Sequence, residues 1–146
     1  MSVPNRKDVR DAFATLLVSV LTSAQRIYPL TNSDGDRLTQ PADFGGESPV
    51  VVVASSGTER TQLTFRGQQP KVFLDVYTFV RADTLAPDDV LDDMEQQLGQ
   101  AVASGQNGAQ WTALDYDGRS QTEFITTLNG TEYKREKTTI KITARL

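Results

Sequence analysis

The spacing of apolar residues along the chain predicts two amphipathic helices. The first apolar stripe recurs every three or four positions and consists of Val9, Phe13, Leu16, Leu17, Val20, Leu21 and Ala24. Asn5 is a favourable N-cap for this helix, and Asp8 three residues later can complete a capping box. In the second helix, Pro87 is favourable in the first turn. Gly105 is favourable at the C-terminal end, where helices often finish in a residue with the left-handed αL conformation. The second stripe consists of Val90, Leu91, Met94, Leu98, Ala101 and Val102.

Runs of β-branched and aromatic residues between the two helices predict strands. Residues 50–54 form a continuous apolar run, which is typical of a strand covered on both faces. We expect a turn at residues 55–58, a strand at 61–65 and a second turn at 67–70. Residues 71–81 then alternate between two largely apolar faces, which predicts a central strand.

Two dipeptides in the C-terminal third predict β-hairpins. Asp117-Gly118 and Asn129-Gly130 are strong signals for type I′ turns, because both central residues of that turn need a positive φ. The strands that they join are residues 111–116, 119–128 and 131–146. The chain is therefore expected to end in a β-meander.

The last of these strands does not keep its apolar residues on one face. Ile140, Ile142 and Ala144 share one parity, and Tyr133 has the other. Either a bulge near residues 135–137 or a change of the buried face explains this pattern. The order of elements predicts an α+β fold, in which two helices pack on a mostly antiparallel sheet with C-terminal β-hairpins. We expect a single domain spanning residues 1–146.

A long polar segment, residues 31–48, separates the first helix from the apolar strand. Loops of this length are usually functional or disordered, so we interpret it as a contact arm. Asp34 and Asp36 fit part of a calcium-loop pattern, but Arg37 stands where that loop needs glycine, which favours an ordinary solvated loop. The candidate contact residues in the arm are Asp34, Asp36, Arg37 and Phe44.

Composition removes several classes of chemistry. The 146 residues include no cysteine and no histidine, which excludes a thiolate nucleophile, a Ser-His-Asp triad and the usual tetrahedral zinc sites. Asp75 lies in the middle of an apolar strand, where a carboxylate can act as a general acid or base. It has no histidine to work with, so a structural ion pair or a subunit contact is the favoured interpretation. We expect no catalytic, cofactor-binding or metal-binding residues.

Charge and hydropathy limit the kinds of partner that the chain is expected to bind. The net charge of −4 argues against direct nucleic-acid recognition. The longest apolar run is too short to cross a bilayer, and no signal-peptide core follows the N-terminus. We therefore expect a soluble protein that has no membrane partner and stays in the compartment where it is made.

Charged residues are segregated along the second half of the chain. Six acids occur within residues 83–95 without an intervening base: Asp83, Asp88, Asp89, Asp92, Asp93 and Glu95. The last strand is rich in bases: Lys134, Arg135, Lys137, Lys141 and Arg145. The helix dipole offers a local explanation for the acids near the start of the second helix. The two patches also permit head-to-tail association into a ring, or pairing within one subunit, and the sequence leaves these alternatives open. The candidate subunit contacts are Asp88, Asp89, Asp92, Asp93, Lys134, Arg135, Lys137 and Lys141.

The order of these parts resembles the tail terminator (tail completion) proteins of long-tailed bacteriophages, including the lambda-like ones. The resemblance covers most of residues 5–143 and rests on the whole pattern rather than on one motif. The segments that define it are residues 10–17 (RDAFATLL), 26–29 (RIYP), 48–53 (SPVVVV), 56–60 (SGTER), 73–77 (FLDVY), the acidic helix, 111–118 (WTALDYDG) and 128–134 (LNGTEYK).

The resemblance implies an α+β subunit of a hexameric ring in the virion, assembled in the host cytoplasm. Such a ring caps the completed tail tube, stops its growth and presents a surface at the head–tail junction. The implied partners are further copies of the chain, the tail tube protein and the head–tail connector protein. The family has no catalytic residues to transfer. The alternatives are a head-closure, neck or minor tail protein of the same virion, or a small ligand-binding or enzymatic domain that uses Asp75 or the Asp34/Asp36 loop.

Overall fold

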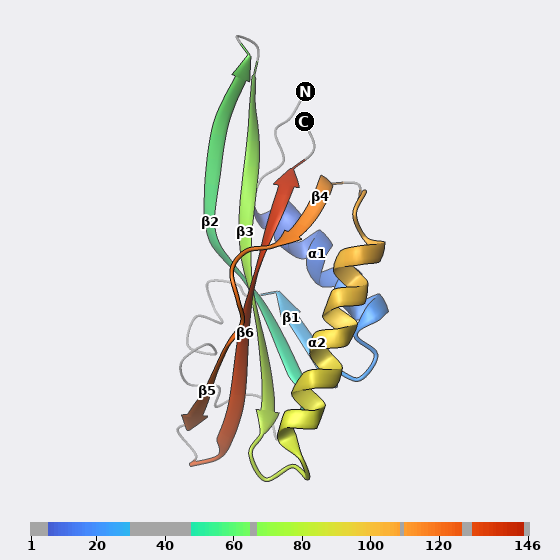
Figure 1. Ribbon diagram of the computed structural model, residues 1–146, viewed down its shortest axis with the longest axis vertical. Helices are drawn as coiled ribbons and strands as arrows, with labels where there is room; N and C mark the ends of the chain where they lie inside the picture. Colours follow the sequence, from blue (N-terminus) through green and yellow to red (C-terminus); the bar gives the residue numbers. More distant parts are fainter. Residues whose placement is uncertain (1–5, 30–47, 65–66, 109, 127–129, 145–146) are drawn as a thin grey trace.

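The computed structural model describes residues 6–29, 48–64, 67–108, 110–126 and 130–144. Two helices and six strands follow one another along these residues (Figure 1). They are α1 (Arg6–Val20), β1 (Arg26–Pro29), β2 (Val50–Thr64), β3 (Gly67–Arg81), α2 (Pro87–Ser104), β4 (Trp111–Tyr116), β5 (Gln121–Thr126) and β6 (Glu132–Ala144). The predicted α+β class is confirmed.

The strands form one mixed, mostly antiparallel sheet. Its order is β1-β2-β3-β6-β4, and β5 also pairs with β6. Among the described strands, β1 and β2 pair in parallel, and the other four pairings are antiparallel. β3 lies in the middle of this order, as its two apolar faces predict. Both helices cover the same face of the sheet (Figure 1).

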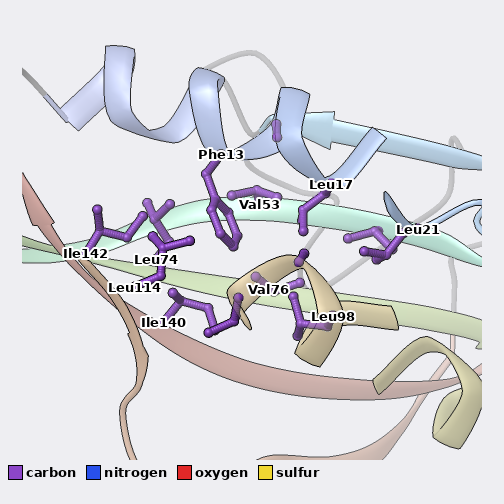
Figure 2. Packing of buried hydrophobic residues seen from close by; sticks show 14 of the residues in the cluster. Phe13, Leu17, Leu21, Val53, Leu74, Val76, Leu98, Leu114, Ile140 and Ile142 are labelled. Atoms are coloured by element: carbon purple, nitrogen blue, oxygen red, sulfur yellow. The ribbon is translucent and has the colours of Figure 1, made fainter. Parts of the chain in front are cut away.

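The main hydrophobic core lies between the helices and the sheet. Phe13 and Leu17 of α1 and Leu98 of α2 pack with Leu74 and Ile140 of the sheet (Figure 2). Both predicted apolar stripes therefore face the sheet. Each large side chain buried in this way contributes roughly 1.5–3 kcal/mol of transfer free energy.

A smaller cluster lies on the opposite face of the sheet. It contains Val50, Val52, Phe79 and Tyr133, with Tyr77 packed against it. The rings of Phe79 and Tyr133 meet edge to face at 6.3 Å. The pairing of β3 with β6 has no register shift. A change of the buried face, and not a bulge in this pairing, thus explains the parity of Tyr133.

The turns predicted at residues 55–58 and 67–70 are both wrong, because these residues belong to β2 and β3. Residues 55–58 continue β2, and a register shift between Ser55 and Gly57 takes the place of the expected turn. Residues 67–70 open β3 instead of forming a turn. Small polar residues and glycine favour turns locally, but a long antiparallel pairing accommodates them through a bulge.

The predicted hairpin at Asp117-Gly118 is also wrong. β4 and β5 do not reverse on each other, because both pair antiparallel with β6 and run in one direction along its edge. Residues 117–120 bulge out between them, and the Asp117 amide donates to the Thr139 carbonyl at 2.9 Å. Gly118 does adopt a positive φ of 78°. The local conformation was predictable, whereas pairing with β6 decided the direction of the chain.

The other two glycine predictions have different outcomes. β5 and β6 pair antiparallel as predicted, and their described ladder ends with Thr126 opposite Glu132. Gly130 has a φ of 83°, as the expected turn requires, but Asn129 lies outside the described residues, so the two-residue turn stays a prediction. Gly105 ends α2, but with a φ of −96° rather than in the left-handed region. A Cβ at this position would lie 2.6 Å from Leu16 Cδ2, so close packing explains the glycine. Asn5, the predicted N-cap of α1, lies outside the described residues.

Candidate functional site

A two-stranded ribbon projects from one end of the sheet. The pairing of β3 with β6 stops at Lys71, opposite Thr143. Beyond this point, residues 60–64 of β2 and 67–70 of β3 pair only with each other among the described residues. Figure 1 shows this hairpin extending past the helices and the other strands. We call it the β2–β3 ribbon. A two-stranded ribbon without further support contributes little to the stability of a monomer.

The opposite end of the molecule exposes two large apolar side chains. Leu85 lies in the loop between β3 and α2 and is 93% exposed, and Phe124 of β5 is 67% exposed. The loop and β5 lie at the end farthest from the β2–β3 ribbon (Figure 1). The ammonium group of Lys134 lies over the Phe124 ring, 5.6 Å from its centroid. Sequence patterning missed both residues, because neither belongs to an apolar stripe.

The predicted basic patch is mostly paired within the subunit. Three of its members form ion pairs: Lys134 with Asp88, Arg135 with Glu123, and Lys137 with Asp75. Lys141 forms no ion pair in the part of the chain that the structure describes. Pairing within one subunit, one of the two alternatives from sequence, therefore accounts for the contact between α2 and β6 at Asp88 and Lys134.

Asp75 lies in a structural network on the face opposite the helices. It is 8% exposed, and its Oδ1 accepts a hydrogen bond of 2.7 Å from Thr139 Oγ1. Lys137 Nζ lies 3.7 Å from Oδ2. Burial and the neighbouring Asp75 carboxylate raise the pKa of Tyr77, and the Arg135 guanidinium stacks 5.0 Å from the centre of that ring. These contacts fit the interpretation of Asp75 as a structural ion pair.

The acidic face of α2 remains largely uncompensated. Asp89, Asp92 and Asp93 are exposed, and none of them forms an ion pair with a described residue. Asp93 accepts a hydrogen bond of 3.1 Å from Ser23 Oγ. Although Lys134 pairs with Asp88, this face of α2 therefore keeps the excess of negative charge that the sequence predicts.

This acidic face borders an open groove of about 710 Å³ between α2 and the bulge that links β4 to β5. We call it the acidic groove. It is lined by Asp92, Glu95, Gln96, Tyr116, Gly118, Arg119, Ser120 and Thr138. Burial raises the pKa of Glu136, a neighbouring residue of β6, and the negative charges of Glu95 and Asp92 raise it further. A hydrogen bond from Ser120 and the charge of Lys134 partly oppose this rise in the pKa.

Sequence reasoning missed the contribution of β6 to this groove. The sequence analysis singled out neither Glu136 nor Thr138 as a candidate residue. Both share the parity of Ile140, which packs in the core beneath the helices, so alternation along β6 directs them toward α2. That parity was the available signal, but only the pairing of the strands shows that α2 lies across from it.

The remaining candidate positions and site types have simple outcomes. Asp34, Asp36, Arg37 and Phe44 lie outside the described residues, so the contact arm stays a prediction. Within the described ranges, no group of three or more acidic, histidine or cysteine side chains is placed to hold a metal ion. No helix found in those ranges is long and apolar enough to cross a membrane.

No protein-family model and no curated protein matches the chain.

Proposed function

We propose that the protein is a tail terminator subunit of a long-tailed bacteriophage. In this proposal, copies of the chain form a ring that caps the tail tube, ends its polymerisation and offers the surface for joining the head. The order of parts along the chain supports the proposal, as does the absence of cysteine and histidine. The structural observation that carries it is the projecting β2–β3 ribbon.

The ribbon supports a role in assembly because it has no third strand beside it among the described residues. Residues 60–64 and 67–70 share ladder hydrogen bonds only with each other within the described part of the chain. An isolated two-stranded hairpin is marginal in water, whereas a third strand or a packed face makes it stable. A neighbouring subunit or the tail tube supplies such a face. The ribbon is therefore best explained as a contact with another chain.

The two ends of the molecule suit a subunit that has different neighbours on its two sides. The β2–β3 ribbon lies at one end, and the β3–α2 loop and β5, which carry the exposed Leu85 and Phe124, lie at the other. A terminating ring needs this polarity, because one face must bind the last ring of the tube. The other face must then offer no equivalent polymerising surface. The proposed mechanism is thus geometric, and the subunit number of six comes from the resemblance alone.

The proposal is tested by replacing residues 60–70 with Asn-Gly. This change joins Glu59 to Lys71, which are paired in the ladder, through a two-residue loop. We expect the shortened chain to keep its free energy of unfolding within about 1 kcal/mol, because the ribbon does not pair with the rest of the described fold. Its particle mass is measured by light scattering, and tube lengths are measured by electron microscopy after addition to polymerising tubes.

The intact chain is expected to form a multimeric ring and to give tubes of uniform length. The shortened chain is expected to remain folded but to lose one or both properties. A shortened chain that caps tubes normally contradicts the role given to the ribbon. An intact chain that stays monomeric with and without tubes, and leaves their length unregulated, contradicts the proposed function. Density above the terminal ring, rather than at it, would indicate a neck protein instead.

A further inference from the structure

We propose that the β2–β3 ribbon turns as a unit on a hinge at its root. The ribbon root consists of residues 55–58 of β2, which contain a bulge, and Pro70 of β3. Three observations support a hinge there: two buried hydroxyls without partners, a glycine that its local geometry does not require, and sparse strand pairing around the root. The hinge belongs to the single subunit, so this inference goes beyond the proposed function.

β2 contains an extra residue where it approaches the ribbon. Ser55 is opposite Leu74 and Gly57 is opposite Phe73, so Ser56 has no residue of β3 across from it. A bulge of this kind bends the strand and leaves its extra residue out of the ladder. Figure 1 shows β2 curving between the part beside β1 and the ribbon. The direction of the ribbon is therefore set at this bulge.

Two buried hydroxyls at the bulge lack hydrogen-bond partners. Ser55 Oγ and Thr58 Oγ1 are both buried, and neither has a partner among the residues that the structure describes. Both residues lie on the helix-covered face, because their ladder partners, Leu74 and Val72, belong to the main core. A buried hydroxyl without a hydrogen bond is costly. This position of the ribbon therefore carries a penalty, which a movement that admits water to the root relieves.

Gly57 is a glycine that its local geometry does not require. It is not one of the described glycines with a positive φ, and a Cβ built on it meets no atom within 4 Å. An alanine therefore fits this position while the ribbon stays where it is. Glycine adds backbone freedom, which a hinge residue needs when its φ and ψ change.

Strand pairing around the root is sparse. β1 pairs with β2 only as far as Val53, so the bulge has β3 as its single neighbouring strand among the described residues. β6 pairs with β3 only as far as Lys71. The adjacent Pro70 is opposite Arg60 but has no amide hydrogen to donate to the ladder. Few hydrogen bonds therefore resist a change of direction between the ribbon and the rest of the sheet.

Electron paramagnetic resonance tests the hinge, because the chain has no cysteine and spin labels attach only at introduced ones. The hinge pair combines Gln62→Cys in the ribbon with Gln100→Cys at an exposed position of α2. The body pair combines Gln100→Cys with Thr122→Cys at an exposed position of β5. Labelled chains are diluted into unlabelled chains, so that only distances within one subunit are measured. We expect two distance maxima for the hinge pair and one for the body pair.

A third pair of labels separates a hinge from fraying of the ribbon. Thr61→Cys and Gln69→Cys lie across the ladder from each other. Continuous-wave spectra should show these two labels close together in all molecules, because a hinge moves the ribbon as a unit. Separation of this pair, or a single maximum for the hinge pair, would overturn the inference.

Substitutions at the bulge test what sets the balance between the two positions of the ribbon. Ser55→Ala combined with Thr58→Val removes the unpartnered hydroxyls, so it should favour the position described here. The population of the second position should fall at least about fivefold, and the chain should unfold at the same urea concentration or a higher one. Gly57→Ala restricts the backbone where space is available, so it should act in the same direction.

Ser56→Ala is the matched control, because Ser56 lies in the same bulge but is exposed. It should leave both distance maxima unchanged. An equal effect of the control and of the Ser55→Ala, Thr58→Val variant contradicts the role of the buried hydroxyls. Unchanged populations in that variant and in Gly57→Ala contradict the hinge itself.

The hinge and the proposed function fail in different ways. Two maxima in a chain that neither forms rings nor caps tubes support the hinge and contradict the proposed function. One maximum in a chain that forms rings and caps tubes contradicts the hinge, and the proposed function stands.

Discussion

Thr139→Val tests the network that buries Asp75. The hydroxyl of Thr139 donates a 2.7 Å hydrogen bond to a carboxylate that is 8% exposed. Valine has the same shape but no donor. The carboxylate then keeps Lys137 Nζ at 3.7 Å as its charged partner, and the Lys137 side chain is 37% exposed. The substitution therefore leaves a buried charge with weaker compensation.

The expected cost follows from these contacts. A hydrogen bond to a charged group contributes about 1.5–3 kcal/mol, and the retained lysine places the loss near 2 kcal/mol. For a chain of this length, such a loss lowers Tm by roughly 4–8 °C. Asp75→Asn keeps an oxygen acceptor but removes the charge. In that background, the same Thr139→Val change should cost only about 1 kcal/mol, which gives a coupling energy of about 1 kcal/mol.

Urea unfolding followed by circular dichroism and by the fluorescence of Trp111, the single tryptophan, measures all four members of this cycle. Thr143→Val is the matched control, because Thr143 lies on the same face of β6 but does not contact Asp75. It should change the free energy of unfolding by less than about 0.5 kcal/mol. Equal costs at positions 139 and 143, or equal costs of Thr139→Val in both backgrounds, would refute the structural role given to Asp75.

Three further changes probe other parts of the fold. Because the pKa of Glu136 is raised in the folded state, the folded chain holds this proton more tightly than the unfolded chain. Glu136 therefore lowers the free energy of unfolding as the pH rises above 4.5, the ordinary pKa of the group. Glu136→Gln should therefore raise Tm at pH 7, and the gain should vanish when pH falls below 4.5; a gain that persists there contradicts this explanation. Gly105→Ala should cost about 1–3 kcal/mol in urea unfolding because its Cβ meets Leu16, and a neutral effect would contradict the packing argument. Phe13→Ala should cost about 3–5 kcal/mol, since Phe13 is fully buried against Trp111, and a loss below 2 kcal/mol would place it outside the core.

Periodic features of the sequence predicted the elements that carry the main core. The stripes of α1 and α2 repeat over several turns, and the two faces of β3 repeat over a whole strand. Because each pattern repeats several times, one exceptional residue does not change the element that it predicts. The fold class and the central position of β3 followed from them.

Local turn signals were less informative because pairing partners decide their outcome. Asp117-Gly118 has the composition of a hairpin turn, yet the edge of β6 accepts both β4 and β5 and leaves the dipeptide in a bulge. Gly57 likewise lies at a register shift within β2. A short sequence specifies a positive φ or a flexible position, but it does not specify which strand lies across the sheet.

The candidate site shows the same limit for charges. The sequence indicated an acidic helix and a basic strand, but it did not show whether they pair within the subunit or between subunits. Their contact at Asp88 and Lys134 depends on the docking of α2 onto β6. The acidic groove combines Asp92 and Glu95 with Glu136, which is about forty positions away in the chain. Only the tertiary arrangement identifies such a site.

Electron microscopy of tail tubes completed with the full-length chain tests the central proposal most directly. The proposal predicts one closed ring of several copies at the end of each tube, together with tubes of uniform length. Tubes that continue to grow with no ring at their ends, in the presence of a folded and monomeric chain, would contradict it.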